Sequence, residues 1–132
     1  MFKISTKSDY ALIIMMELAK NANLGYLSLS IIAKKMQISA SYLTQIAQPL
    51  IKANLIESRE GKMGGLKLAK SAKKISVLDI MEAIENTGQL KCFQVGKRTC
   101  PNIKLCGVKK AWLSIITNMK EVLIKEKLSD LI

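Results

Sequence analysis

The sequence contains no histidine, only two prolines and six aromatic residues among 132, namely one tryptophan, three tyrosines and two phenylalanines. Histidine is the commonest general base, and neither a nucleophile motif nor a phosphate-binding loop replaces it, so we do not expect an enzyme. Long apolar runs are also missing: residues 10–19 form the best one, which is too short to span a bilayer and is interrupted by Glu17. Since no signal peptide is visible either, we expect a cytoplasmic protein with no membrane partner.

Acidic side chains are scarce relative to basic ones. Lysine and arginine total 21 against 10 aspartates and glutamates, which gives a formal net charge of +11. Residues 1–74 carry +8 of this excess and residues 75–132 carry +3. Such an excess favours a polyanionic partner, above all nucleic acid, and places the anion-binding surface mostly in the N-terminal part. Apolar residues make up 49% of the chain, enough for one main domain with its own core.

The first half of the chain predicts a helix-turn-helix. Residues 7–22 indicate a helix that is apolar nearly all round, and therefore buried, with Ser8 or Asp9 as its cap. Two short helices follow, joined by a tight turn at residues 37–39, which is the pattern of a helix-turn-helix. Pro49 is expected to kink or loosen the last turn of the second helix. We expect the N-terminal half of that helix to enter the major groove through Ser39 (also the expected cap), Ala40, Ser41, Tyr42, Thr44 and Gln45.

Residues 55–70 change to a period of two, which predicts a β-hairpin with a loop rich in glycine and charge. A hairpin directly after a helix-turn-helix makes a winged helix, so the fold class is mainly α with a small β-hairpin wing. Basic residues surround the loop at Arg59, Lys62 and Lys67, and we expect them to contact DNA phosphates.

The C-terminal part predicts two further helices around a loop. Ser76 can cap a helix over residues 77–86, and residues 108–127 form a long amphipathic helix. We expect a winged helix-turn-helix domain over residues 1–86, a cysteine loop over 87–107, and a dimerisation helix with a C-terminal tail over 108–132. The apolar stripe of the long helix needs a partner, either a second copy or the chain's own domain. Because helix-turn-helix proteins typically read half-sites as dimers, we favour the homodimer. The stripe includes Val108, Ala111, Trp112, Ile115, Ile116, Met119, Val122 and Leu123.

Several stretches in this order resemble the Rrf family of bacterial winged-helix regulators, with its IscR-, NsrR-, RirA- and CymR-like members. They are TKSDYAL (6–12), IAKKMQISASYLTQI (32–46), LIESREGKMGGLKLAK (55–70) and ISVLDIMEAIE (75–85), followed by the cysteine loop and a long helix. The resemblance implies a homodimer on a palindromic operator and, in many members, an iron–sulfur cluster held by three loop cysteines and a fourth ligand. This chain departs from the family pattern at Thr44, Glu60 and Leu66, so operator preference and wing contacts need not carry over.

All three cysteines of the chain, Cys92, Cys100 and Cys106, lie in the expected loop. An odd number leaves one unpaired in any disulfide scheme, and the close cysteine pairs of structural zinc sites are absent. Thiolates are the usual ligands of iron–sulfur clusters, so we favour a [2Fe–2S] or [4Fe–4S] cluster, ahead of a metal-free thiol switch. Without histidine, the histidine-ligated form is excluded. The resemblance to NsrR-like members implies Asp9, from the partner subunit, as fourth ligand; a helix cap is the alternative role.

The sequence therefore predicts a dimeric, DNA-binding transcription regulator. Through its cluster it would sense redox state, nitric oxide or iron–sulfur status. The alternative is a cluster-free winged-helix regulator controlled by thiol oxidation or by a protein partner, as in CymR-like members.

Overall fold

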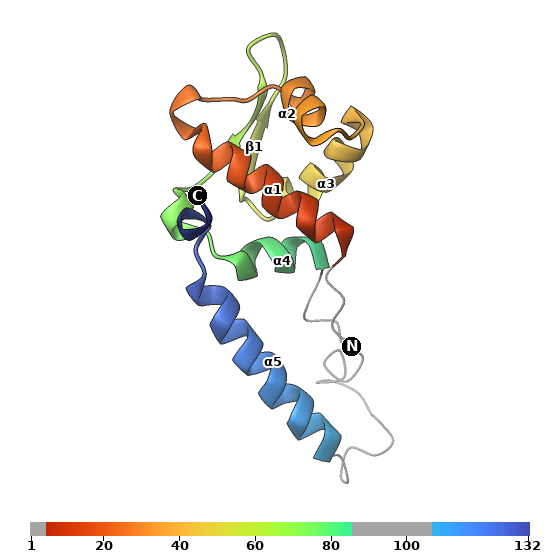
Figure 1. Cartoon of the computed structure of the whole chain (residues 1–132), viewed down its shortest axis with the longest axis vertical. Helices are drawn as coiled ribbons and strands as arrows, with labels where there is room; N and C mark the ends of the chain where they lie inside the picture. Colours follow the sequence, from red (N-terminus) through yellow and green to blue (C-terminus); the bar gives the residue numbers. More distant parts are fainter. Residues whose placement is uncertain (1–4, 86–106) are drawn as a thin grey trace.

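The computed structural model describes residues 5–85 and 107–132 and is mainly helical, with one two-stranded antiparallel sheet (Figure 1). Its elements are α1 (Thr6–Lys20), η1 (Ala22–Leu24), α2 (Leu29–Met36), α3 (Ala40–Lys52), β1 (Ile56–Arg59), β2 (Gly65–Leu68), η2 (Ala72–Lys74), α4 (Val77–Glu85), α5 (Gly107–Lys125) and η4 (Leu128–Leu131). The predicted winged helix-turn-helix is confirmed. Among the described residues, none of the helices has the length and apolar character needed to cross a membrane.

The helix ends show which predicted caps form. Ser39 caps α3, since its Oγ accepts the Tyr42 N–H at 3.1 Å. Ser76 caps α4 through a reciprocal pair with Asp79, in which each backbone N–H donates to the other's side chain. The expected cap of α1 at Ser8 or Asp9 is wrong: Ser5 is the N-cap, because the helix begins earlier and the Ser5 Oγ accepts the Ser8 N–H.

Pro49 lies inside α3, and the helix continues through it to Lys52. Its missing N–H removes one intrahelical hydrogen bond, but only three residues of helix follow it. The Ala53 N–H donates to the Pro49 carbonyl at 3.0 Å, so the last turn is still closed. The expected loosening of this turn is therefore not observed.

The hairpin pairs Ile56 with Leu68 and Arg59 with Gly65. Its loop is closed by the Gly64 N–H, which donates to the Gly61 carbonyl at 3.0 Å. A Cβ on Gly64 would lie 2.1 Å from the Arg59 carbonyl oxygen, so only glycine fits there.

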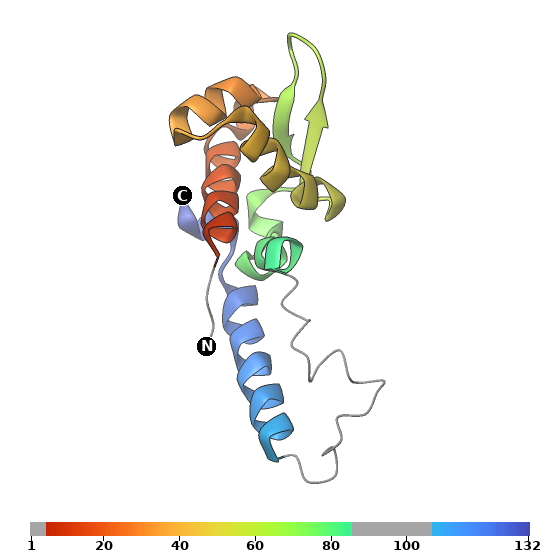
Figure 2. The ribbon, with the colours of Figure 1, turned by 90° about the vertical axis from the view of Figure 1, so that its right-hand side faces the viewer.

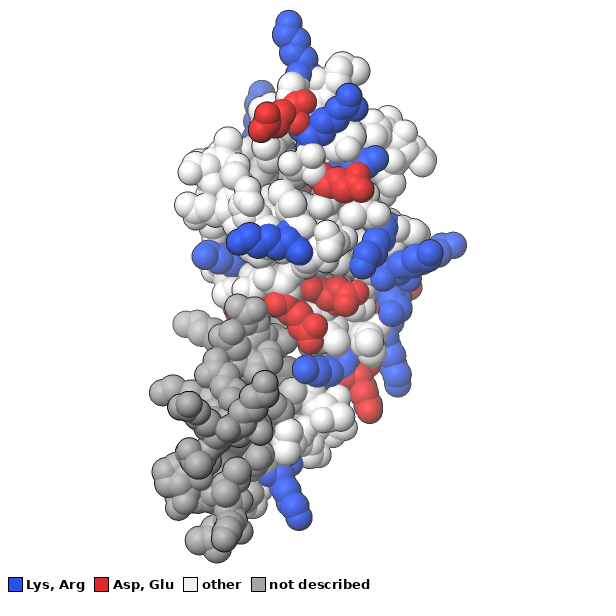
Figure 3. Space-filling view, turned by 180° about the vertical axis from the view of Figure 1, so that it is seen from behind, with Lys and Arg blue, Asp and Glu red and all other residues white. Residues whose placement is uncertain are grey.

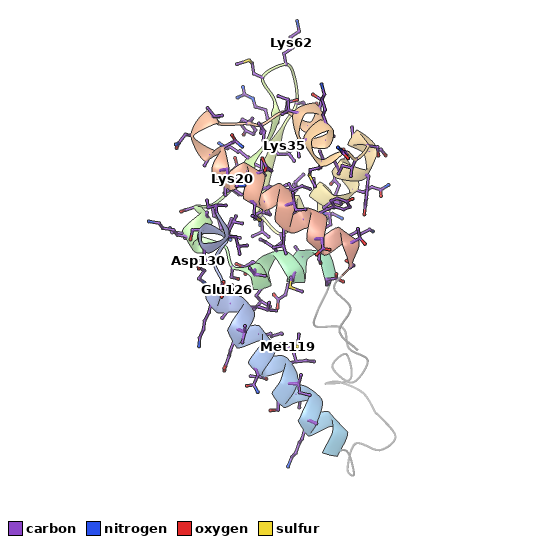
Figure 4. The ribbon with its side chains drawn as sticks, in the orientation of Figure 1. Lys20, Lys35, Lys62, Met119, Glu126 and Asp130 are labelled. Carbon is purple, nitrogen blue, oxygen red and sulfur yellow. The ribbon has the colours of Figure 1, made fainter. Side chains whose placement is uncertain are left out.

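The helices and strands of the winged domain share one hydrophobic core. Its fully buried large apolar side chains are Ile14, Met15, Ile32, Leu43, Ile46, Leu50, Ile56, Leu66, Ile75, Ile80 and Leu128. α1 crosses this core, but Ile13 is exposed, so the helix is not buried all round as predicted. The Glu17 carboxylate at the edge of the core pairs with the Lys35 Nζ at 2.7 Å and ties α1 to α2; Figure 4 labels Lys35 beside α1.

Figure 1 shows α5 projecting from the winged domain: its N-terminal end is the farthest from the domain, and its C-terminal end leads to η4 beside it. The Val77 N–H donates to the Glu126 carbonyl and the Leu128 N–H donates to the Ile75 carbonyl, both at 2.8 Å. These bonds hold η4 against the winged domain, and Leu128 completes its core. Sequence patterns did not indicate this contact of the C-terminal residues with the winged domain, and the three-part division at residues 86 and 107 stays a prediction.

Candidate nucleic-acid interface

The helix-turn-helix and the hairpin lie together at the end of the molecule opposite α5 (Figure 2). The turn between α2 and α3 is formed by Gln37, whose φ of 57° lies in the left-handed region. One side of α3 is buried in the core through Leu43, Ile46, Ala47 and Leu50. Of the predicted DNA-contacting residues on the other side, Ser39, Ala40, Ser41, Thr44 and Gln45 are all exposed. The core therefore turns the polar N-terminal side of α3 outward.

Not every residue on this side is equally free to contact DNA. Thr44 Oγ1 donates to the Ala40 carbonyl at 2.9 Å, so its hydroxyl proton is engaged within the helix. Tyr42 is half-buried, with its ring edge-to-face against Tyr10 of α1 at a centroid distance of 5.6 Å and an angle of 80°. This contact fixes the angle of α3 on α1, a role that the sequence did not indicate. Ser41 and Gln45 remain as exposed polar side chains that can rotate toward the DNA.

The three predicted wing cations have different surroundings. Lys62 stands at the apex of the hairpin, where Figure 4 shows it pointing away from the protein, next to Met63, which is 84% exposed. Arg59 and Lys67 instead lie over the ring of Tyr26, with the Arg59 Cζ at 5.8 Å and the Lys67 Nζ at 4.8 Å from its centroid. Sequence reasoning missed Tyr26, although an aromatic residue directly before the alternating apolar pair Leu27 and Leu29 was a signal for a further strand.

Acidic side chains interrupt the positive surface. Figure 3 shows lysines and arginines at the hairpin tip and along the side of the winged domain, with carboxylates between them. On the hairpin, Glu57 Oε2 lies 3.5 Å from the Lys67 Nζ, and Glu60 is two residues before Lys62 in the chain. The wing thus carries less net positive charge than its basic residues alone suggest.

The predicted cysteine ligands Cys92, Cys100 and Cys106 lie outside the described residues. Within residues 5–85 and 107–132, the structure contains no group of three or more histidine, cysteine, aspartate or glutamate side chains that could hold a metal. Asp9, the fourth candidate, is exposed on the first turns of α1. An exposed carboxylate on a helix is accessible to serve as one ligand of a site whose other ligands come from other segments.

The start of α1 is tied to the end of α4, where the chain leads into the cysteine segment. The Glu85 carboxylate accepts the Ser5 N–H at 2.9 Å and the Ser8 hydroxyl at 2.7 Å. Hydrogen bonding from the Ser5 side chain, and after it from the Ser8 hydroxyl and the Ser5 N–H, lowers the pKa of the Glu85 carboxyl below its usual value. Glu85, the last described residue before the cysteine segment, therefore lies beside the turn of α1 that carries Asp9.

The predicted apolar stripe of α5 is divided between two environments. Ile116 is only 7% exposed in the single chain, and the Lys120 Nζ lies 3.8 Å from the Glu82 Oε1, which joins α5 to α4. By contrast, Ile115 is 42% and Val122 62% exposed, and their seven-residue spacing puts them on one face. The side chains of Val108 and Trp112 lie outside what the structure describes. Packing on the chain's own domain thus accounts for one side of the stripe and leaves the other open.

A helix-turn-helix with a capped, outward-facing second helix and an adjoining basic hairpin defines a winged-helix DNA-binding protein. The model of the Rrf2 family, described as an iron-dependent transcriptional regulator, matches residues 4–132, and the chain belongs to this family. It is accordingly a transcription regulator and not an enzyme, as the sequence predicted.

Relatives of known name cover nearly the whole chain. CymR of Bacillus subtilis (strain 168) is 36% identical over 129 residues, which span 98% of this chain and 88% of CymR. IscR of Cereibacter sphaeroides is 41% identical over 87 residues, which span 64% of this chain and 56% of IscR.

Solved structures agree with this assignment. CymR, the global cysteine regulator of B. subtilis, has a TM-score of 0.77 at 34% identity, covering 99% of this chain and 96% of CymR. IscR of T. potens has a TM-score of 0.75 at 32% identity, covering 98% of this chain and 85% of IscR.

Proposed function

We propose that two copies of this chain bind a palindromic operator as a homodimer. The observation that carries this proposal is the shared placement of the polar side of α3 and the basic hairpin at one end of the molecule (Figure 2). The opposite end offers the second requirement, an apolar face of α5 centred on Ile115 and Val122 that the single chain leaves exposed. One end suits DNA and the other suits a second copy.

On the operator, α3 enters the major groove. Ser39, Ala40 and Ser41 approach the phosphates, because a helix N-terminus favours anions. Gln45 faces the base edges, and its amide has the donor and acceptor pattern that pairs with adenine. Thr44 lies beside it and contacts the bases through its methyl group or as an acceptor, since its hydroxyl proton is engaged by the Ala40 carbonyl. Tyr42 sets the docking angle of α3 through Tyr10. The wing contacts the DNA backbone through Arg59 and Lys62. Lys67, which the sequence predicted as a third contact, lies 3.5 Å from the Glu57 carboxylate and is not among the proposed phosphate contacts.

As the sensory element we propose an iron–sulfur cluster held by Cys92, Cys100, Cys106 and the Asp9 carboxylate, with Asp9 supplied by the partner subunit. When bound, such a cluster supplies an iron centre that reacts with oxygen or nitric oxide. The exposed position of Asp9 on the first turn of α1 supports this arrangement, since its carboxylate is accessible to a segment of a second subunit.

A cluster-free regulator is the second candidate, and the similarity to CymR supports it. CymR of Staphylococcus aureus has been solved in an oxidised form, with which this chain shares 33% identity at a TM-score of 0.72. In this alternative, thiol oxidation of the three cysteines or a protein partner would control DNA binding.

Anaerobic purification separates the two candidates. The cluster hypothesis expects iron, acid-labile sulfide and a charge-transfer absorption band, all lost in each of Cys92→Ala, Cys100→Ala and Cys106→Ala. Asp9→Ala should keep the cluster but make it more sensitive to oxygen, because water or a thiol can replace a carboxylate. A colourless, iron-free protein that still loses DNA binding on thiol oxidation would establish the alternative instead.

The DNA function is tested with the same preparations. Selection from randomised duplexes should yield a palindrome, and sedimentation should show a dimer bound to it. Lys62→Ala should weaken binding to all duplexes and reduce the salt slope, log Kd against log salt, by about one unit. Gln45→Ala should instead relax the sequence preference. Unselective binding by the parent protein would contradict the proposal.

A further inference from the structure

Tyr26 lies just before α2, outside both the predicted recognition helix and the predicted wing. The backbone of its neighbour Leu27 is paired with Leu66 of β2 by two hydrogen bonds of 2.8 Å, one in each direction. This pairing adds a short third segment to the edge of the hairpin. The position of Tyr26 is therefore fixed relative to the wing by backbone bonds, and not only by its side chain.

The hairpin has two faces, and Tyr26 lies on the outer one. Ile56 and Leu66 are buried, so they point toward the core. Side chains alternate along a strand, so Glu57, Arg59 and Lys67 point the other way. That is the face where the Arg59 Cζ and the Lys67 Nζ approach the Tyr26 ring, at 5.8 and 4.8 Å.

The two cations on this ring differ in their acidic partners. Glu57 lies directly opposite Lys67 in the strand register, and their charged atoms are 3.5 Å apart. Arg59 lies opposite Gly65, which has no side chain to support it. Within residues 5–85 and 107–132, no carboxylate is in ion-pair contact with Arg59. The positive charge of its guanidinium is thus not neutralised by a carboxylate in this part of the chain. The guanidinium lies against the Tyr26 ring.

We infer that Tyr26 is a positioning residue for DNA binding: its ring holds the Arg59 guanidinium on the outer face of the wing, ready to contact a phosphate of the operator backbone. Lys67 also lies over the ring, but its ammonium group is paired with the Glu57 carboxylate, so Lys67 contributes little to DNA affinity. This inference rests on the proposed DNA function and ranks the wing cations, with Arg59 and Lys62 ahead of Lys67. Because a held side chain loses less rotamer freedom on binding, the aromatic contact favours the complex.

The test compares Tyr26→Leu, Tyr26→Phe, Arg59→Ala and the double variant Tyr26→Leu/Arg59→Ala, in fluorescence anisotropy with a selected operator over a series of salt concentrations. Arg59→Ala should reduce the salt slope by about one unit. Tyr26→Leu should weaken binding about two- to fivefold, as expected for loss of an exposed cation–π contact, and lower the slope in the same direction. Tyr26→Phe keeps the ring and should match the parent. The double variant should bind no more weakly than Arg59→Ala alone.

Lys67→Gln is the matched control, because it removes the other cation from the same ring at an exposed position. It should leave the affinity within about twofold of the parent and the salt slope unchanged. A Lys67→Gln slope that falls as much as that of Arg59→Ala would overturn the ranking. Additive losses in the double variant, or a weakened Tyr26→Leu with an unchanged slope and a lowered melting temperature, would show that Tyr26 serves only folding. A parent protein that binds no duplex would instead refute the proposed function.

Discussion

The winged domain and α5 differ in how far their apolar side chains are buried. In the winged domain, α1, α2, α3, α4, the hairpin and η4 close around one core, and the side chains at its centre are fully buried. In α5, only Ile116 is buried among the described side chains, and Leu113, Ile115, Val122 and Ile124 remain exposed. In the single chain, α5 thus leaves an apolar surface uncovered, whereas the winged domain covers its own core. The comparison predicts that changes in the first region act on folding and changes in the second act on assembly.

The largest effect should come from charges on the open face of α5. Ile115→Asp with Val122→Asp would place two carboxylates in a desolvated interface, at a cost of several kcal/mol if they are unpaired. Sedimentation should then show monomers, while thermal unfolding stays close to that of the parent because both positions are exposed in the single chain.

Ile116→Asp is the matched contrast, since it charges the adjacent but buried position of the same helix. It should lower the melting temperature as well as disturb assembly. Although Ile116 belongs to the predicted stripe, its substitution therefore does not test the dimer alone. A dimer that survives Ile115→Asp/Val122→Asp would place the interface elsewhere.

Next in size is the truncation of Leu128, which tests whether η4 belongs to the winged domain. Leu128→Ala removes a fully buried side chain and should reduce the free energy of unfolding by about 2–5 kcal/mol. Ile132→Ala, at an exposed position nearby, should have little effect. Urea unfolding of both variants measures the difference, and equal stabilities would show that the tail only rests on the domain.

A smaller change is expected at the cap of α3. Ser39→Ala leaves the Tyr42 N–H without its side-chain acceptor and should reduce stability by about 1 kcal/mol. Ser39→Asp restores an acceptor and should recover the stability, but its negative charge should weaken DNA binding. The two variants thereby separate folding from DNA affinity at one residue, by thermal unfolding and anisotropy. Recovery of both properties in Ser39→Asp would remove Ser39 from the phosphate contacts.

The smallest effect concerns Glu85, whose carboxyl has a pKa in the folded state below its ordinary value. A lowered pKa means that the stabilisation is present above the unfolded-state pKa and is lost as the pH falls through the folded-state value. Glu85→Gln should therefore be less stable than the parent at pH 7, and the difference should shrink in acid. Melting temperatures from pH 7 to pH 3 measure this convergence, and a constant difference would mean that charge is not involved.

Local patterns in the sequence predicted those features of the fold that short stretches determine. The spacing of Leu43, Ile46 and Leu50 gives the buried side of α3, and the serines before α3 and α4 give their caps. The glycines of the hairpin give the turn, because no other residue fits at Gly64.

Features that depend on contacts between distant residues were not predictable in this way. Leu128 looks like any tail residue until its N–H meets the Ile75 carbonyl, and Tyr26 becomes part of the wing only through the pairing of Leu27 with Leu66. The periodicity of the apolar residues likewise located the stripe of α5. It did not indicate that one side of the stripe packs against α4 while the other side stays exposed. Of the candidate site, the sequence indicated which side chains could contact DNA but not how Tyr10, Tyr26 and Glu57 restrict them.

The pairing of residues 75–77 with 126–128 also bears on the order in which the protein forms during synthesis. The contacts among α1, α2, α3 and the hairpin are available early, but the core lacks Leu128 until the ribosome has produced α5 as well. Until the cysteine segment and α5 have been synthesised, the core around Ile75 therefore lacks the apolar side chain that completes it. Contacts between residues so distant in sequence are slow to form. Final closure of the winged domain should thus be a late event, coupled to the time at which α5 becomes available to a second copy.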